Sequence, residues 1–559
     1  MSDWLRTRRV IATTIREQLV ADERTLLLTL SGISVCVLLI CCANMSNLLL
    51  ARHLNREREM ALRVSLGATR GRLIRQLLTE AFTLCMMGTA SGFLAGWGLM
   101  SISHNLLSDS RFKGLMTIGY QVVDLRIAAF TIILTIFTTV LFGLVPSLHF
   151  TRADLSEALK SLPKGLSRDR GGSPITRYLV ALELAIAFIL LTGTGLLVRS
   201  FVGLLSEDRG YTVDHLLTAR LPIPSGISVT PSRRKQVFHE LIDRLERMPN
   251  VVSVGIATSL PLGGLNAKMT LQRPGQPLDP ENLPWVGINC VNPDYFRSMG
   301  IHLVKGRGFD SSDDENGMRV AVINETLQRQ FWPGRDVIGQ EIMEGIRIVG
   351  VVNDIRQEAL DTRQGPTFYL PFEQRDGLAA APNFLLVRTK GDPRGFIPTL
   401  RTLVGSVDHL QPLVDIRTME EVLSRSVTQR RLLTALMTGF AALAVALSMV
   451  GIYGVLSYVV NNRRKEIGIR VCLGARQREV LILLTRQVSS SIVAGLLGGL
   501  TVSLLVAGVL SRWLFAVRPN DPMTLLIAAI VTATVALLGG IVPAVRALHF
   551  DPMEVVRME

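Results

Sequence analysis

Seven long stretches with almost no charged residues dominate this sequence. Each runs for about 20 residues or more, enough for a helix rising 1.5 Å per residue to cross roughly 30 Å of hydrocarbon. They cover residues 26–50, 81–102, 127–148, 178–198, 432–460, 488–510 and 525–545. Buried helices of water-soluble proteins have one apolar face and are usually shorter, whereas these stretches are apolar all round. The sequence therefore predicts seven transmembrane helices in a lipid bilayer.

The formal net charge is +14, and the positions of the basic residues decide what this charge means. Arginine and lysine cluster beside the apolar stretches, at residues 51–75, 152–177 and 463–486. The positive-inside rule makes these segments cytoplasmic, and the clustering does not favour a nucleic-acid partner. One topology satisfies all of them, with the N-terminus outside, the C-terminus in the cytoplasm and the long stretch 199–430 outside.

One segment occurs twice, each time between two apolar stretches. Residues 59–68 read Glu-Met-Ala-Leu-Arg-Val-Ser-Leu-Gly-Ala, and residues 466–475 read Glu-Ile-Gly-Ile-Arg-Val-Cys-Leu-Gly-Ala. Gly-Leu-Val-Pro at 143–146 likewise returns as Gly-Ile-Val-Pro at 540–543. Self-similarity of this kind indicates a duplicated unit. We expect two membrane modules of three helices each, at 25–160 and 431–559.

The rest of the chain lies between or before the modules. Residues 161–177 are rich in Gly, Ser, Pro and Arg and predict a cytoplasmic linker, followed by the helix 178–198. Short strands at 251–257, 319–323, 346–352 and 384–387, with helices at 231–248 and 396–404, predict an α+β extracytoplasmic domain at 199–430. Its one cysteine, Cys290, leaves it without an internal disulfide. By the register of the repeat, residues 1–24 are expected to be an extracytoplasmic remnant of a first domain and helix that the chain lacks.

The repeated segment is the candidate site for a partner. Glutamate and arginine four residues apart share one helix face, and the Gly-Ala pair allows a close approach. The residues are Glu59, Arg63, Gly67 and Ala68 in the first copy, and Glu466, Arg470, Gly474 and Ala475 in the second. An interfacial helix that only holds lipid phosphates is the simpler interpretation. Two matching copies favour two docking sites for a two-fold cytoplasmic partner.

No catalytic pattern is present in the sequence. It contains no Gly-x-x-x-x-Gly-Lys-Ser/Thr loop for nucleotide phosphates, no His-Glu-x-x-His, no Gly-x-Ser-x-Gly and no Cys-x-x-Cys. We therefore expect no enzyme activity, no catalytic, cofactor or metal site, and a partner subunit that binds ATP.

Glu183, Asn44 and Asn47 are polar residues inside predicted membrane helices. Glu183 follows the start of the fourth stretch by about one turn, where a charge is costly. A functional role competes with a carboxylate that snorkels or pairs with Arg177 or a neighbouring helix, and the second interpretation is favoured. Asn44, like Asn47, is expected to hydrogen-bond between helices rather than to bind a substrate.

Together the Glu-x-x-x-Arg-x-x-Leu-Gly-Ala segments, the last helix with its Asp-Pro-Met-Glu-Val-Val-Arg tail at 551–557, and the external domain resemble the FtsX-like, macrolide-exporter (MacB-type) permeases of ABC transporters. The double copy resembles the acidobacterial duplicated orphan permeases. The resemblance implies a bacterial inner-membrane permease whose repeated segments are coupling helices seated on a separate ABC ATPase dimer. In the external domain it is carried mainly by Asn-Pro-Asp-Tyr-Phe at 292–296 and Gly-Arg-Gly-Phe at 306–309.

The resemblance implies export or release of a drug, peptide or lipoprotein. It also implies an extracytoplasmic partner, a substrate or a protein, whose identity the sequence does not give. The alternative is a mechanotransmitter that transports nothing and regulates an external partner such as a cell-wall hydrolase. An ion-coupled transporter ranks last, because it would need several charges within the membrane and broken helices.

Overall fold

The computed structural model describes residues 15–55, 63, 69–106, 125–152, 174–222, 230–264, 266–272, 284–343, 345–362, 364–374, 383–462, 477–510 and 514–548. The chain divides into two compact units. One combines Met1–Phe201 with Leu432–Glu559, and the other is Val202–Arg431. Each unit is described separately below.

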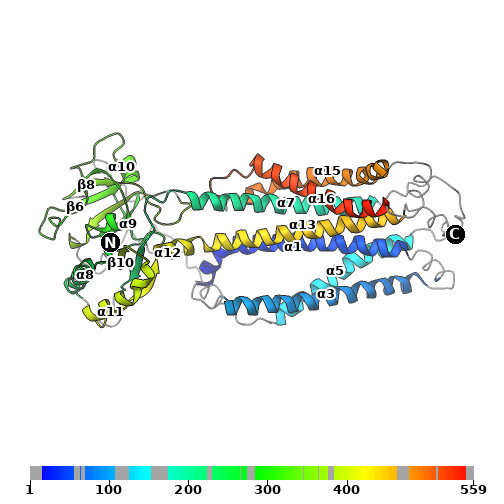
Figure 1. Ribbon diagram of the computed structural model, residues 1–559, viewed down its shortest axis with the longest axis horizontal. Helices are drawn as coiled ribbons and strands as arrows, with labels where there is room; N and C mark the ends of the chain where they lie inside the picture. Colours follow the sequence, from blue (N-terminus) through cyan, green and yellow to red (C-terminus); the bar gives the residue numbers. More distant parts are fainter. Residues whose placement is uncertain are drawn as a thin grey trace, which may run out of the picture. The chain divides into compact units, whose positions relative to one another are not determined.

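Long helices make up the described part of the first unit, and they run roughly parallel (Figure 1). They are α1 (Ile15–Asn55), α3 (Arg70–Leu106), α5 (Leu125–Arg152), α7 (Pro174–Ser206), α13 (Thr428–Asn462), α15 (Gln477–Leu510) and α16 (Pro522–Leu548). Within the described residues, six are long and apolar enough to cross a membrane, while α5 contributes a shorter apolar stretch, Arg126–Val140. Large apolar side chains such as Leu505 and Met87 point outward on α15 and α3, as lipid-facing residues do.

A shared apolar core joins α1, α7 and α13. Ile40 on α1, Ala187 on α7 and Ala444 on α13 are almost fully buried in one cluster. Because Ala187 and Ala444 are small, the helix backbones can approach closely. In a membrane the hydrophobic effect does not bring helices together, so close packing of this kind drives their association. Elsewhere α3 packs on α5, where the hydroxyls of Thr89 and Thr135 lie 3.0 Å apart.

Small residues also set the contact between α7 and α15. A methyl group placed on Gly495 would lie 2.8 Å from the carbonyl oxygen of Ala181. One placed on Gly499 would lie 2.9 Å from the carbonyl oxygen of Ala185. These separations are too short for a side chain, so the two glycines allow α15 to lie directly on the backbone of α7.

The second unit is built on one mixed sheet. The strand order is β11-β1-β10-β2-β4-β9-β6-β8-β5, with β3 added beside β4 and β7 beside β8. The strands are β1 (Leu216–Arg220), β2 (Val251–Ala257), β3 (Lys268–Thr270), β4 (Trp285–Val291), β5 (Leu303–Gly306), β6 (Val320–Asn324), β7 (Glu341–Met343), β8 (Ile346–Val352), β9 (Thr367–Pro371), β10 (Phe384–Thr389) and β11 (Val414–Thr418). Most neighbours are antiparallel, but β4 with β9 and β6 with β8 are parallel.

Helices cover both faces of this sheet. They are α8 (Pro231–Glu246), α9 (Tyr295–Met299), α10 (Glu325–Phe331), α11 (Ile397–Val407) and α12 (Met419–Ser426), with short 3₁₀ turns η1 (Phe372–Gln374) and η3 (Pro393–Phe396). Successive residues of β10 therefore enter two separate cores, with Leu385 and Val387 in one and Phe384 and Leu386 in the other. A strand covered on both faces is a continuous apolar run, which is why β10 and β8 are easy to find in the sequence.

The segment 292–296, which carries much of the family resemblance, is structural. Asn292 is buried; its Nδ2 donates to the Val254 carbonyl at 2.8 Å and its Oδ1 accepts from the Ile256 amide at 2.9 Å. This side chain thus continues the sheet beyond the single β2–β4 pair, Ala257 with Val291. Tyr295, which follows on α9, is fully buried in the second core.

The segment 306–309 has the same kind of role. Phe309 packs on Phe296 with ring centroids 5.8 Å apart. Arg307 donates two hydrogen bonds, of 2.7 and 2.8 Å, to the buried carboxylate of Asp313, and these bonds raise the pKa of the guanidinium. A methyl group on Gly306, whose φ is 72°, would lie 2.2 Å from the Val349 carbonyl oxygen. The motif therefore fixes a turn and a core.

Candidate functional site

Seven of the eight predicted coupling residues lie outside the described residues. They are Glu59, Gly67, Ala68, Glu466, Arg470, Gly474 and Ala475. Arg63 is described: it is helical and half-buried, and its Nη1 donates to Gln76 Oε1 of α3 at 3.0 Å. The arginine of the first repeated segment is thus hydrogen-bonded to the helix that follows it.

A buried polar cluster lies where α1, α7 and α13 meet. The fully buried carboxylate of Glu183 accepts a hydrogen bond of 3.2 Å from Asn47 Nδ2. Asn44 Nδ2 donates to the carbonyl of Leu447 on α13 at 2.8 Å. The cluster therefore links three helices through polar side chains, and Glu183, Asn44 and Asn47 are all polar residues singled out in the sequence.

Gly451 of α13 closes this cluster. A methyl group there would lie 2.1 Å from Asn44 Oδ1 and 2.4 Å from Glu183 Oε2. Both oxygens therefore contact the Gly451 backbone, within reach of weak Cα–H donors. Neither oxygen has a hydrogen-bond partner in the described structure, nor does the buried hydroxyl of Ser448.

The arrangement of Glu183 differs from a snorkelling carboxylate. Its side chain does not reach solvent, and Arg177 is exposed. Its partners come from neighbouring helices, because Asn47 and Gly451 surround it. Sequence reasoning did not find Gly451 or Ser448, since neither residue type is unusual in an apolar helix. The one available signal was the cost of burying Glu183 without a polar partner.

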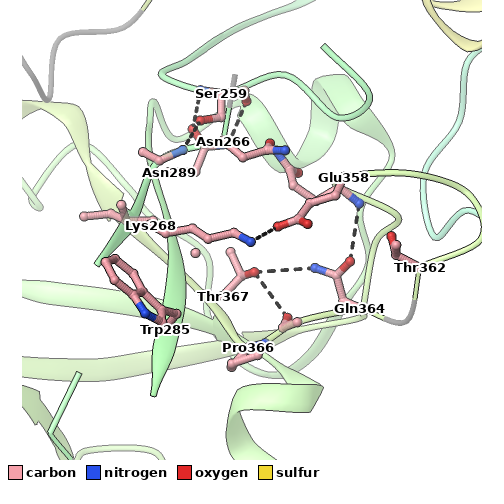
Figure 2. A pocket seen from close by; sticks show the side chains of 15 residues that line it. Ser259, Asn266, Lys268, Trp285, Asn289, Glu358, Thr362, Gln364, Pro366 and Thr367 are labelled. Carbon is pink, nitrogen blue, oxygen red and sulfur yellow. Dashed lines mark hydrogen bonds and ion pairs between the residues drawn. The ribbon is translucent and has the colours of Figure 1, made fainter. Parts of the chain in front are cut away.

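The second unit contains a small pocket of about 160 Å³ between the β3–β4 hairpin and the loop that precedes β9 (Figure 2). Trp285 lies at one side, 60% exposed, and Lys268 forms an ion pair with Glu358 across the pocket. The side-chain amides of Asn266, Gln357 and Gln364 are also part of the lining.

Two side-chain hydrogen bonds at this pocket are long. Gln357 Nε2 donates to Asn266 Oδ1 at 3.3 Å, and Gln364 Nε2 donates to Thr367 Oγ1 at 3.4 Å. Bonds of this length are weak. The lining holds no paired nucleophile and base, so its groups suit binding rather than catalysis. Across the described residues, no three His, Cys, Asp or Glu side chains are grouped to hold a metal ion.

Family models match most of the chain. The model of the FtsX-like permease C-terminal domain matches residues 31–155 and 438–552. The model of the MacB-like periplasmic core domain matches residues 179–393. The two FtsX-like segments begin at residues 31 and 438. These starts are separated by the same number of residues as Glu59 and Glu466, so the family matches share the register of the repeat.

Curated relatives include macrolide export ATP-binding/permease proteins named MacB. That of Escherichia coli O157:H7 is 28% identical over 281 residues, 48% of this chain and 43% of the relative. That of Escherichia coli K12 is 27% identical with the same coverage. The chain thus spans less than half the length of the curated relatives it matches.

Solved domains similar to part of the chain include the following two. The periplasmic region of MacB from Actinobacillus actinomycetemcomitans has a TM-score of 0.28 and 15% identity, covering 39% of this chain and 95% of that domain. The extracellular domain of the noncanonic ABC-type transporter YknZ from Gram-positive bacteria has a TM-score of 0.26 and 15% identity, covering 36% and 100%.

Proposed function

Since the chain belongs to the FtsX and MacB type of ABC transporter permeases, we propose that it couples ATP hydrolysis by a separate cytoplasmic ABC ATPase dimer to movement of its sheet domain. It lies in the bacterial inner membrane with the N-terminus and the sheet domain outside and the C-terminus inside. The observation that carries the proposal is the FtsX-like match to both membrane segments, each with a charged segment between two apolar helices.

Connectivity supports a mechanical link. Helix α7 leads into the sheet domain, and α13 leaves it, separated from α12 by Val427 alone. The two helices share a buried core with α1 and are joined by the hydrogen bond of 3.1 Å from Thr194 Oγ1 to the Met437 carbonyl. A rigid helix transmits a shift along its axis, so movement at the cytoplasmic ends of this group reaches both connections to the domain.

We propose export or release of a drug, peptide or lipoprotein as the work done. The relatives are named for macrolide export, and the chain itself carries no nucleotide-binding loop. We propose that ATP is a ligand of the partner and that the chain needs no cofactor of its own.

Co-purification tests the docking role. The full chain would be isolated from its native membranes in mild detergent, and ATPase subunits quantified by mass spectrometry. Glu59→Lys combined with Glu466→Lys is expected to reduce the recovered ATPase at least about tenfold, because charge reversal replaces attraction by repulsion. Glu315→Lys combined with Glu341→Lys, an equal charge change at two exposed positions of the sheet domain, should leave recovery unchanged. Undiminished recovery with the double variant would remove the docking role.

A further inference from the structure

The two membrane modules carry the same pair of glycines, but among the described helices a neighbour packs only on the pair in the second module. Gly88 and Gly92 of α3 stand at the positions that correspond, by the register of Glu59 and Glu466, to Gly495 and Gly499 of α15. Both pairs have the spacing Gly-x-x-x-Gly, which puts the two glycines on one helix face.

The α15 pair is occupied by α7, as described above. The contact extends one turn further, because Ile492 of α15 is buried with Val180 and Leu184 of α7. The α7 residues that lie on the glycines, Ala181 and Ala185, are themselves small and four apart. Small residues on both sides allow backbone-to-backbone contact over this length.

The α3 pair is open within the described structure. A methyl group on Gly88 or on Gly92 would meet no atom within 4 Å. The contact between α3 and α5 uses another position, Thr89 with Thr135. Cys85, the counterpart of buried Ile492, is only half-buried. The same face that holds a helix in the second module is therefore unpartnered in the first.

We propose that the Gly88–Gly92 face of α3 binds a transmembrane helix supplied from outside this chain, with alanine or glycine at positions i and i+4 as in α7. The basis is not the glycines alone but the helix that occupies their counterparts. Lipid chains do not match a narrow backbone groove as a helix does, and packing is what drives helix association in membranes. The proposal does not depend on the ATPase partner.

Native Cys85 provides the test. In the full chain the other five cysteines are replaced by serine, and the protein is reconstituted into liposomes. The probe is a synthetic helix with the α7 sequence, residues 174–206, and Leu184→Cys, because Leu184 packs on the counterpart of Cys85. Mild oxidation is expected to give a chain–probe disulfide, measured on a non-reducing gel.

Substitutions on α3 decide whether the glycine face is responsible. Gly88→Leu with Gly92→Leu should reduce the disulfide yield about tenfold, since the added side chains hold the probe away. Ser91→Leu is the matched control, because a methyl group on its counterpart Gly498 would meet no atom within 4 Å, and its yield should stay within about twofold. An unchanged thermal unfolding temperature would show that both variants fold.

Three results would overturn the proposal. They are the absence of a probe adduct with the unaltered face, equal yields with and without the leucines, and a Cys85–Cys85 disulfide between two chains as the main product. The last would mean that the face pairs with a second copy of itself.

Discussion

Glu183 shows how a single buried residue constrains the helical unit. Its Oε2 and Asn44 Oδ1 lie 2.4 and 2.1 Å from the same point above Gly451, so they are at most 4.5 Å apart. Each is an acceptor without a donor, and two facing acceptors repel unless one group carries a hydrogen. A neutral side chain that donates at Oε2 and accepts at Oε1 would give Asn44 Oδ1 a donor and keep the acceptor for Asn47 Nδ2.

This reasoning predicts opposite results for two substitutions. Glu183→Gln keeps an acceptor for Asn47 and adds an N–H donor for Asn44, so the free energy of unfolding should change by less than about 1 kcal/mol. Glu183→Leu removes the acceptor and leaves polar groups unpaired, which should cost about 1 to 3 kcal/mol. Thermal unfolding of the purified chain in detergent measures both. A glutamine variant as unstable as the leucine variant would show that the cluster requires a carboxylate.

Asn292 is the corresponding single residue in the sheet domain. Asn292→Ala removes an acceptor for the Ile256 amide and a donor for the Val254 carbonyl, both buried. Leaving two buried groups unpaired should cost about 2 to 4 kcal/mol. Hydrogen exchange of the β2 amides in the full chain should accelerate, while Asn316→Ala in an exposed turn should not change it. Unaltered exchange in β2 would mean that water replaces the side chain.

At the level of elements, the sequence predicted best where a segment is apolar on all sides. The ranges 251–257 and 346–352 are those of β2 and β8, and each apolar stretch falls within one long helix. The prediction from the sequence missed strands that lack a continuous apolar run. Gly287 and Asn289 interrupt β4, Pro371 ends β9, and charged Asp415 and Arg417 lie in β11 at the sheet edge. These strands form because neighbouring strands pair with them, a tertiary effect.

Helix contacts are harder to predict than helices. Glu183 meets Asn47 and Asn44 meets Leu447 across sequence separations of 136 and 403 residues. Composition identified Glu183 and Asn44 as unusual but not which residues they contact. The glycine pairs were not recognised either, because glycine is frequent in membrane helices.

The contact between α7 and α15 yields an element-scale prediction. Gly495→Val with Gly499→Val places side chains where only 2.8 and 2.9 Å separate an added carbon from α7 carbonyls. The helices must move apart, so the unfolding temperature in detergent should fall by several degrees. Gly498→Val, on the same helix with nothing within 4 Å, should change it little. If the unfolding temperature falls equally in both variants, the cause is valine in a helix and not the interface between α7 and α15.

For the whole molecule, the repeat register has a geometric consequence. Asn44 corresponds to Gly451 when Glu59 is aligned with Glu466, and these two residues lie against each other. Equivalent residues of two copies touch only near the axis that relates them. The aligned positions of α1 and α13 therefore meet, as equivalent helices from two subunits of a dimer do near their two-fold axis.

The predicted topology places the repeated charged segments and the sheet domain on opposite sides of the membrane. In a cysteine-free background, Trp285→Cys and Leu410→Cys provide exposed sites on the sheet domain, 60% and 64% exposed in the native residues. Arg63→Cys and Arg470→Cys mark the repeated segments. A membrane-impermeant maleimide added to intact spheroplasts should label the first two, because charge in the loops orients the helices. The other two should react only after permeabilisation. Labelling of position 63 or 470 from outside would reverse the orientation and leave a cytoplasmic ATPase no access to either segment.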